Sequence, residues 1–446
     1  MRFCVAKKRL KIFFLRIVYK HSIMGGGLLQ LVAYGAQDIY LTGNPQITFF
    51  KVVYRRHTNF AMEAIENVFN GTAGFGKRVT AQISRTGDLI HRIYVQIQMP
   101  TLLSNSVWAD YTGLRVLADV EIEIGGQRID KHYSYWMYIW NELSLPVGKV
   151  AAYNKMVGAD GVARSNLFVP LEFWFNRNVG LALPLIALQY HEVKVNIDFE
   201  TLANCLQYAN GSTSPVIGTH VSTDIVKASL WVDYIYLDTD ERRRFAQLSH
   251  EYLIEQLQFT GDETVTASVT AATSQRIKMN FNHPVKELVW VVQNDARVGL
   301  GSGSNNWINF ATDAPATANG TVATNYGASN PVDESASTNI QLNGQDRFYA
   351  REGSYFNLVQ PYQHHENCGG NPGINVYSFA LKPEEHQPSG TLNFSRIDTA
   401  YLNVKLAAFT TALNAGNVAS AKVKVFAVNY NVLRIMSGMG GLAYSN

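Results

Sequence analysis

The amino-acid sequence predicts a mainly β protein made of two tandem β-sandwiches. Apolar and polar residues alternate with a period of two from about residue 60 onward, which is typical of half-buried strands. Gly, Asn and Pro separate these runs, as expected for turns between short strands. A faint internal duplication predicts that the sandwich occurs twice. The 446 residues are enough for two β domains of roughly 200 residues each.

Four segments show the strand alternation most clearly. In 117–132, LADVEIEIGGQRIDKH, apolar residues alternate with acidic ones up to Gly125-Gly126, a pair that favours a tight hairpin turn. The same period of two runs through 91–100, 191–199 and 421–430. These four segments predict strands that each bury one face.

Helical segments are expected to be few and short. The stretches 134–145 and 242–256 are candidates for helices, and either could equally be a segment packed as a loop. Residues 299–331 are rich in Gly, Ala, Ser, Thr and Asn and are nearly free of charge. Such a stretch cannot form a core of its own, so we expect an exposed loop of a sandwich.

The internal duplication joins two pairs of blocks that occur in the same order. VEIEIGGQRIDKHYSYW at 120–136 resembles IQLNGQDRFYAREGSYF at 340–356. Further on, an aromatic strand flanked by Pro and a long amphipathic strand follow in both halves, with an offset of roughly 210–220 residues. A repeated domain is the better explanation, and its junction is expected near 231–248.

The first 23 residues differ in charge from the rest of the chain. They hold seven basic residues and no acidic one, and the remaining sequence has 31 basic against 35 acidic residues, a net charge of −4. The body therefore has no basic field for gripping DNA or RNA. Arg16 interrupts the apolar stretch that a secretory signal needs, so we expect translation to start at Met24, with a basic membrane-surface helix as the alternative.

Motifs for catalysis or metal binding are incomplete in this sequence. GTAGFGKR at 71–78 has Arg78 where a phosphate-binding loop needs Ser or Thr, so a glycine-rich turn is expected. Neither His191-Glu192 nor His250-Glu251 has the second His of a zinc-protease motif, and His364-His365-Glu366 lacks the spacing of a cupin metal site. Three cysteines lie far apart in sequence, as in a protein that folds in a reducing compartment. We therefore predict no enzyme activity, metal or cofactor.

Four Asn-x-Ser/Thr sequons are candidates for glycosylation: Asn70, Asn210, Asn319 and Asn393. Asn210 and Asn319 lie in small-polar stretches, where a sugar would be accessible. Chance sequons are common, so the alternative is that none is used.

Several strings of the sequence resemble the major capsid proteins of large nucleocytoplasmic DNA viruses, and most closely the chlorovirus (phycodnavirus) type. LVAYGAQDIYLTGNPQITFFKVVYRRHTNFA at 31–61 resembles the amino-terminal arm of that family. The resemblance continues through IGGQRIDKHY, GLALPLIALQYHEVK, VDYIYLDTDERRRFAQLSHEYLIEQLQFTG, IQLNGQDRF and QPSGTLNFSRID to NYNVLRIMSGMGGLAYSN at the carboxyl terminus. It covers nearly everything from Met24 onward, and it departs at residues 1–23 and in the loops around 101–118 and 299–335.

This resemblance implies a double jelly roll, that is, two eight-stranded sandwiches. We divide the chain into a doubtful leader (1–23), an amino-terminal arm (24–50), a first jelly roll (51–240) and a second jelly roll (241–446). The arm is expected to run beneath the sandwiches, or alternatively to pack as an extra edge strand on its own domain.

The resemblance also implies a structural capsid protein that forms homotrimeric, pseudo-hexagonal capsomers of an icosahedral double-stranded DNA virus, assembled in the host cytoplasm. The expected partners are neighbouring capsomers and minor capsid proteins at the inner face, with glycans and the host cell surface as further candidates and without direct nucleic-acid binding. Two alternatives remain: a minor or paralogous capsid protein of the same fold, and a carbohydrate-binding or hydrolysing tandem β-sandwich.

Overall fold

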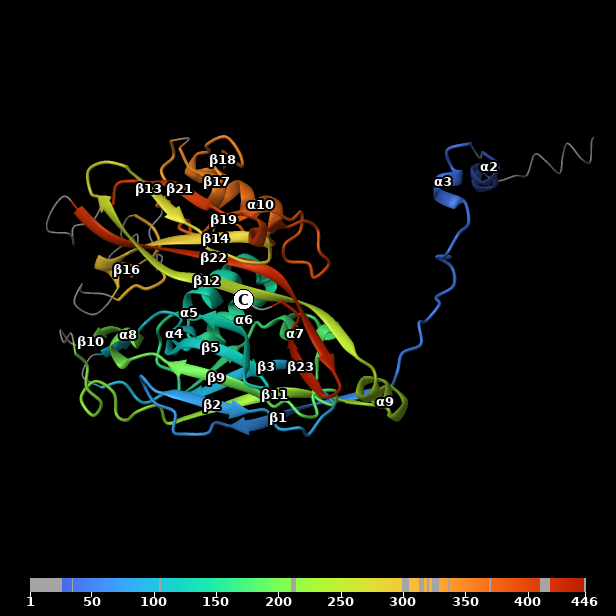
Figure 1. Cartoon of the computed structure of the whole chain (residues 1–446), viewed down its shortest axis with the longest axis horizontal. Helices are drawn as coiled ribbons and strands as arrows, with labels where there is room; N and C mark the ends of the chain where they lie inside the picture. The colour runs from blue at the N-terminus through green and yellow to red at the C-terminus, as the bar shows by residue number, and fades with distance from the viewer. Residues whose placement is uncertain are drawn as a thin grey trace, which may run out of the picture. The chain divides into compact units, whose positions relative to one another are not determined.

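The computed structural model describes residues 26–33, 35–103, 106–209, 214–298, 305–312, 317–318, 321–322, 329–335, 337–368, 370–409 and 418–444. The chain divides into two compact units, residues 1–58 and residues 59–446. In the first unit the described residues form two short helices, α2 (Gly26–Val32) and α3 (Ile39–Thr42), and none of them belongs to a strand. The second unit contains the sandwiches (Figure 1).

The first sandwich consists of two antiparallel sheets whose strands have the orders β1-β11-β3-β7 and β2-β9-β5-β6. A short strand, β8, also pairs with β3. The bounds of these strands are β1 Phe60–Val68, β2 Arg78–Gln82, β3 Leu89–Gln98, β5 Leu117–Ile124, β6 Gln127–Tyr133, β7 Asn166–Pro170, β8 Leu183–Pro184, β9 Val193–Phe199 and β11 Lys227–Leu237.

The second sandwich repeats this topology strand for strand. Its sheets have the orders β12-β22-β14-β19 and β13-β21-β17-β18, and β20 pairs with β14 as β8 pairs with β3. The bounds are β12 His250–Ser268, β13 Thr273–Lys278, β14 Pro284–Asn294, β17 Asn339–Leu342, β18 Gln345–Asp346, β19 Asn375–Ser378, β20 Leu392–Asn393, β21 Ala400–Leu406 and β22 Val418–Met436. The predicted duplication of an eight-stranded sandwich is therefore confirmed.

Smaller elements connect these strands or lie at their ends. The strands are β4 Ser106–Trp108, β10 Leu206–Ala209, β15 Thr317–Ala318, β16 Thr321–Val322 and β23 Met439–Leu442. The helices are α4 Thr112–Val116, α5 Ser134–Ser144, α6 Val147–Val157, α7 Trp174–Arg177, η1 Val179–Leu181, α8 Leu202–Cys205, α9 Thr239–Gln247, η2 Asp295–Arg297, η4 Tyr355–Val359, α10 Gln360–His364 and η5 Phe394–Arg396. None of the described helices is long and apolar enough to cross a membrane.

The same turn chemistry closes the matching hairpin in both sandwiches. Gly125 and Gly126 have φ angles of 58° and 86° between β5 and β6, and Asn343 and Gly344 have 48° and 82° between β17 and β18. A two-residue turn with two positive φ angles matches the twist of the flanking strands, and Gly and Asn adopt it with the least strain. In each half a helix follows this hairpin: α5 in the first, and the continuous segment formed by η4 and α10 in the second.

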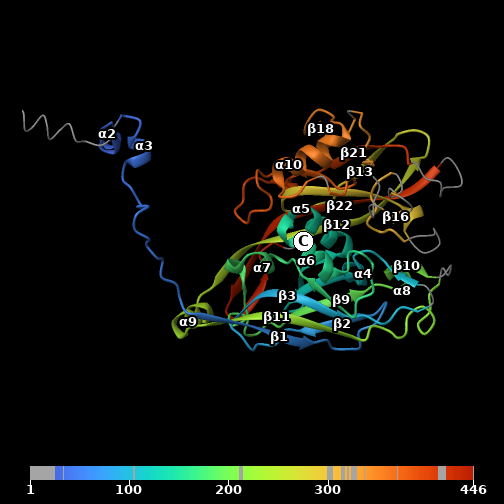
Figure 2. The same cartoon turned by 180° about the vertical axis from the view of Figure 1, so that it is seen from behind.

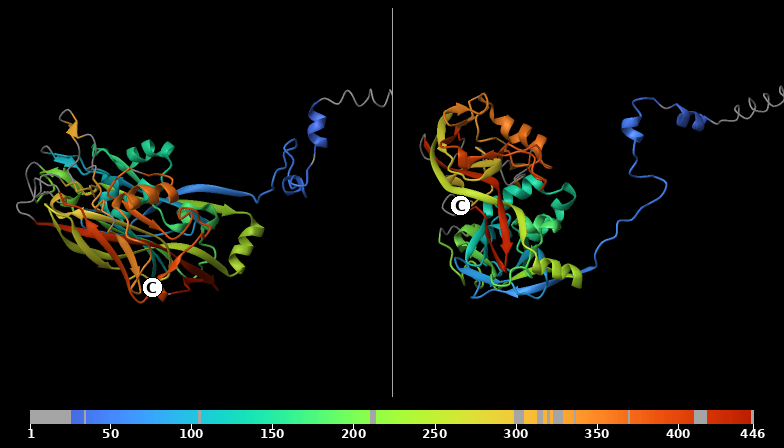
Figure 3. Two further views of the ribbon diagram at one scale, coloured as in Figure 1. Left: turned by 90° about the horizontal axis from the view of Figure 1, so that it is seen from above. Right: turned by 45° about the vertical axis from the view of Figure 1, so that its right-hand side comes forward.

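The apolar core of the first sandwich extends to the outer face of the second, whose own core is a separate cluster. Leu288, Trp290 and Val292 of β14 point into the core of the second sandwich. Their neighbours Val289 and Val291 point the other way and belong to the core of the first. Figure 3 shows the second half, in yellow to red, stacked on the first, in blue to green, with helices between them.

Two predictions about loops and helices were wrong. The helix expected over 242–256 ends at Gln247, and the rest of that stretch begins the long strand β12, which pairs with β22 along its whole length. The exposure expected for 299–331 is wrong for residues 305–312, which are buried because Trp307, Ile308 and Phe310 pack against the first sandwich. Residues 299–304, 313–316, 319–320 and 323–328 of that stretch lie outside the described residues. Helix α6, which the alternation does not reveal, lies between Pro146 and Gly158. The helix expected over 134–145 is confirmed as α5.

Candidate functional site: the seam between the sandwiches

The surface with the most unusual chemistry is the seam, which we define as the contact between the two halves. In the first half it comprises α5, β6 and the segments beside them; in the second it comprises the outer face of sheet β12-β22-β14-β19 with residues 305–312 and 360–384. Helix α5 ends where Pro146 disfavours helical backbone in the preceding residue. Its aromatic side chains enter the seam. Tyr135 and Tyr138 lie 5.4 and 5.9 Å from Trp307, measured between ring centroids, and Trp136 lies 5.4 Å from Phe426. Such pairs add specific geometry to the burial of large apolar area.

Hydrogen bonds across the seam satisfy buried polar groups that would otherwise lack a partner. Trp307 Nε1 donates to the carbonyl oxygen of Asp110 at 2.8 Å. The backbone N–H of Asn367 donates to the carbonyl oxygen of Leu143 at 3.0 Å. The backbone N–H of Leu257 donates to the carboxylate of Asp130 at 3.0 Å. A buried polar group without such a partner would cost free energy, so these bonds hold one relative position of the two sandwiches.

A cluster of six charged residues lies at one end of the seam. Arg177 of the first half donates to Glu255 of β12 at 2.8 Å and lies over the ring of Trp140 at 4.3 Å. Lys286 of β14, which is completely buried, reaches the other oxygen of Glu255 at 2.8 Å. Glu255 therefore joins a cation of each sandwich.

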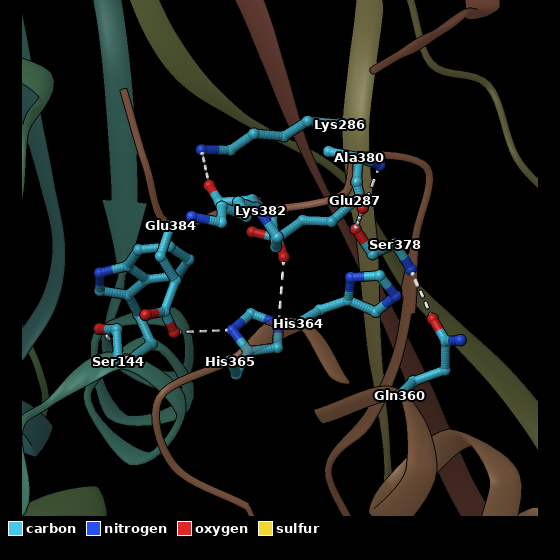
Figure 4. Close-up of polar contacts among 12 residues, drawn as sticks. Ser144, Lys286, Glu287, Gln360, His364, His365, Ser378, Ala380, Lys382 and Glu384 are labelled. Carbon is cyan, nitrogen blue, oxygen red and sulfur yellow. Dashed lines mark hydrogen bonds and ion pairs between the residues drawn. The ribbon is translucent and has the colours of Figure 1, made fainter. Parts of the chain in front are cut away.

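His365 forms the second part of this cluster. Its Nε2 lies 3.2 Å from Glu287 and its Nδ1 lies 2.9 Å from Glu384, so the imidazole bridges two carboxylates (Figure 4). Burial alone would lower the pKa of His365, but the two carboxylates outweigh it and raise this pKa to about 9. For Glu287, burial raises the pKa, while His365 and Lys286 outweigh burial and lower it. Both residues are therefore charged at neutral pH.

The cluster is balanced, with three cations matched by three carboxylates. Arg177, Lys286 and His365 each contact Glu255, Glu287 or Glu384, as described above. A cavity of about 440 Å³ opens beside Arg177, Glu255 and Glu384. Each of these carboxylates is paired with a cation, so separating the two sandwiches or removing one partner would leave an uncompensated buried charge. The cluster therefore fixes one arrangement of the seam.

A cation–π contact crosses the other side of the seam, beside an ion pair within the second half. Lys424 of β22 binds Asp262 and lies 4.5 Å from the ring of Tyr135, measured to its centroid. Burial lowers the pKa of Lys424, while Asp262 opposes that change. This contact again joins a charged strand residue of the second half to the helix of the first.

The residues that sequence motifs singled out lie in ordinary structural settings. Lys77 forms a 2.9 Å ion pair with Asp224 at the glycine-rich turn, and Arg78 begins strand β2, as that prediction expected. His365 belongs to the ionic cluster, and His364 makes a 3.0 Å hydrogen bond with the carbonyl of Leu381. Among the described residues no group of three or more His, Cys, Asp or Glu side chains has the arrangement of a metal site.

Two of the four sequon asparagines are described, and both are exposed. Asn70 bonds through its backbone N–H to Thr80, and the side-chain oxygen of Asn393 accepts a bond of 3.0 Å from the backbone N–H of Ser395. Asn210 and Asn319 lie outside the described residues. The ionic cluster had no motif in the sequence, because Glu287 meets His365, and Arg177 meets Glu255, only through folding.

Comparison with known proteins places the seam in a known architecture. Residues 48–238 match the model "Major capsid protein N-terminus", and residues 241–441 match "Large eukaryotic DNA virus major capsid protein". The major capsid protein of Pyramimonas orientalis virus is 52% identical over 95% of this chain and 100% of its own length. That of Paramecium bursaria Chlorella virus 1 is 50% identical with the same coverage.

Solved structures agree with the sequence comparison. The crystal structure of PBCV-1 VP54, fitted into a reconstruction of the virophage Sputnik, is 45% identical and covers 90% of this chain and 100% of its own, with a TM-score of 0.73. The Faustovirus major capsid protein, 14% identical with a TM-score of 0.67 over 90% of this chain and 94% of its own, shares the fold alone. The chain belongs to the major capsid proteins of large eukaryotic DNA viruses, as a double-jelly-roll structural component of the capsid and not an enzyme.

Proposed function

We propose that three copies of this chain form a pseudo-hexagonal capsomer, the tile of an icosahedral shell that is assembled in the host cytoplasm. The observation that carries the proposal is the repeated topology. Two sandwiches with the same strand order, held side by side by the seam, give six similar sandwiches in a closed threefold ring. Six similar corners fit a hexagonal lattice. The quasi-atomic model of the PBCV-1 capsid, which is 45% identical to this chain, supports a place in such a shell.

We further propose the division of the chain into an arm (24–50), a first jelly roll (51–240) and a second jelly roll (241–446). The arm would contact neighbouring capsomers or minor capsid proteins at the inner face. Its described part supports this role, because Phe49 and Phe50 expose 88% and 98% of their surface. Exposed apolar residues that gather in this way mark a protein interaction surface.

Sugars and the host surface belong to the outer side of the proposed tile. The intact mass of the protein from purified particles tests the four glycosylation candidates together: Asn70, Asn210, Asn319 and Asn393. The bare chain weighs 49.7 kDa if residues 1–23 are present and less if it starts at Met24. A mass above either of these values by whole sugar residues would support glycosylation, and a bare protein mass would exclude it. The same mass would show whether residues 1–23 are present.

The trimer is tested by size-exclusion chromatography with light scattering on the full chain. We expect three times the chain mass of 49.7 kDa, at protein concentrations at which a large, permanent interface stays closed. A single species near 49.7 kDa at all concentrations would contradict the capsomer proposal.

A further inference from the structure

We propose that the seam inside one chain is repeated between chains, so that helix η4–α10 of one copy docks on the outer face of sheet β1-β11-β3-β7 of the next copy. This inference deepens the proposed function, because it rests on the capsomer and names the two surfaces that build it. The occupant of each surface is a second copy of this chain.

Sheet β1-β11-β3-β7 matches sheet β12-β22-β14-β19 residue by residue. In β3 and β11, Tyr94 lies opposite Trp231, and in β14 and β22, Val289 lies opposite Phe426. Both matches are separated by 195 residues along the chain. The side chains of Tyr94 and Trp231 therefore occupy the places that Val289 and Phe426 occupy in the second sandwich.

Of these two matching outer faces, the one with Val289 and Phe426 is covered, and the one with Tyr94 and Trp231 is not. Val289 and Phe426 are buried, and Trp136 of α5 packs on Phe426. The matching face of the first sandwich carries three half-buried aromatic side chains. Tyr94 stacks on Trp231, with ring centroids 6.2 Å apart, and meets Phe168 at 6.3 Å.

The edge strand β1 enlarges this open face. Val68 and Met62 expose 68% and 48% of their surface, and their register with β11 places them on the side of Trp231. In the part of the chain that the structure describes, this face is covered only at its Ile235 end, where Ala182 and Phe245 pack. Around Tyr94 and Trp231, where Glu66 and Lys227 form an ion pair beside the rings, it is open.

The second half carries a helix that matches α5, the segment Tyr355–His364, and one face of it is exposed. Ser134-Tyr135-Trp136 at the start of α5 corresponds to Ser354-Tyr355-Phe356 at the start of the segment Tyr355–His364. The spacing of 220 residues then pairs Tyr138 and Ile139 with Leu358 and Val359.

Burial differs sharply between these matched positions. Tyr138 and Ile139 are buried in the seam, whereas Leu358, Val359 and Tyr362 expose 49%, 40% and 78% of their surface. Tyr362 lies four positions after Leu358 and three after Val359, the spacings at which helical side chains are neighbours, so both residues flank Tyr362 on one face. The second helix therefore presents an apolar face of the kind that α5 buries.

The two open faces lie far apart on the molecule. Figures 1 and 2 show α10 and strand β1 at opposite ends of the unit formed by residues 59–446, so the two faces cannot meet within one chain. A surface and its complement at opposite ends produce a head-to-tail contact, and such contacts close into a ring when the rotation allows it. The seam itself supplies the docking geometry, which argues for another copy of this chain rather than an unrelated partner.

The test uses one variant on each face. Tyr362→Glu alters the helix, and Trp231→Lys alters the sheet, with Val68→Lys as a second sheet variant at a fully accessible edge. We expect the unaltered chain to be a trimer and each variant to be a folded monomer, with circular dichroism and thermal unfolding as the check of folding. Val162→Lys changes an exposed valine that lies on neither face, and we expect this control to remain trimeric.

Mixing the two kinds of variant gives the most specific result. A Tyr362→Glu chain keeps an intact sheet face and a Trp231→Lys chain keeps an intact helix, so the mixture should form a one-to-one dimer and no trimer. A mixture that stays monomeric across a concentration series, or variants that remain trimeric, would overturn the inference while leaving the capsomer proposal intact. A monomeric unaltered chain would instead contradict the capsomer proposal itself.

Discussion

Helix α5 and its counterpart, the segment Tyr355–His364, follow the same hairpin in two sandwiches of the same topology, yet they differ in what covers them. Helix α5 lies under the second sandwich and carries Trp136, Tyr138 and Trp140 into the seam. Its counterpart inserts Phe356 into its own core and leaves Leu358 and Tyr362 at the surface. The comparison teaches that the repeat encodes the sandwich, while the residues that differ between the repeats encode which face meets which neighbour.

The largest expected effect breaks the part that the two halves share. Val195 of β9 is completely buried, and Val195→Asp places an unpaired charge in the core of the first sandwich. We expect a loss of more than about 4 kcal/mol in the free energy of unfolding, and an unfolded first sandwich by circular dichroism.

Two companions sharpen this prediction. Leu402→Asp makes a similar change in the buried counterpart strand β21 and should be equally severe, whereas Gln82→Asp, on the exposed side of β2, should be nearly neutral. A folded and stable Val195→Asp chain would contradict the assignment of the first core.

The next effect separates the two matched helices. Tyr138→Ala removes a buried ring from the seam and should lower the free energy of unfolding by about 3 kcal/mol, as expected for a large-to-small change in a core. Leu358→Ala, at the matched exposed position, should change the stability of the isolated chain by less than about 0.5 kcal/mol. Urea unfolding of both variants under monomeric conditions measures the difference, and equal losses would contradict the contrast between the helices.

The pH dependence of stability reports on His365. Because its folded pKa is raised to about 9 from an ordinary value of 6.5, its contribution is fully present below pH 6.5 and is lost as the pH rises through about 9. A shift of this size corresponds to about 3 kcal/mol, which we expect urea unfolding between pH 6 and pH 10 to detect as a falling stability.

Substitution of each histidine separates this effect from other groups that titrate in the same range. His365→Gln should be less stable at pH 6 and should fall less steeply with rising pH, since Glu287 and Glu384 lose their shared cation. His364→Gln is the matched control, because His364 contacts only a backbone carbonyl among its described partners and should keep the original slope. An unchanged slope in His365→Gln would refute the role given to the ionic cluster.

The smallest effect on stability is expected from the arm. Deletion of residues 25–50 should leave the unfolding free energy of the sandwiches unchanged within about 0.5 kcal/mol, because these residues lie in a separate compact unit. The same deletion should impair assembly into particles, which electron microscopy of assembly reactions measures. Loss of folding would refute the arm model.

The sequence predicted the strands well because a half-buried strand alternates apolar and polar residues with a period of two. The Gly125-Gly126 and Asn343-Gly344 turns are equally local, so the hairpins that precede the two helices were accessible to the same reasoning. The burial of Trp307 and Phe310 was not accessible, since a small-polar neighbourhood suggested exposure and the covering residues Tyr135 and Tyr138 lie far away in sequence.

The same limit applies to the site. Glu384 follows His365 by 19 residues. Glu287 reaches His365 only when the second sandwich folds, and Arg177 reaches Glu255 only when the two sandwiches pack. Helix α6 has only a weak local signal in the sequence, Pro146 before it and Gly158 after it, and this signal contains no period-two alternation.

The most direct test of the central claim is a high-resolution cryo-electron microscopy map of the purified assembly of this chain. We predict that the segment Tyr355–His364 of each copy lies on the Tyr94 and Trp231 face of the next copy, as α5 lies on Val289 and Phe426 within one chain. A map in which that sheet face is open to solvent, or is covered by any other element, would contradict the account.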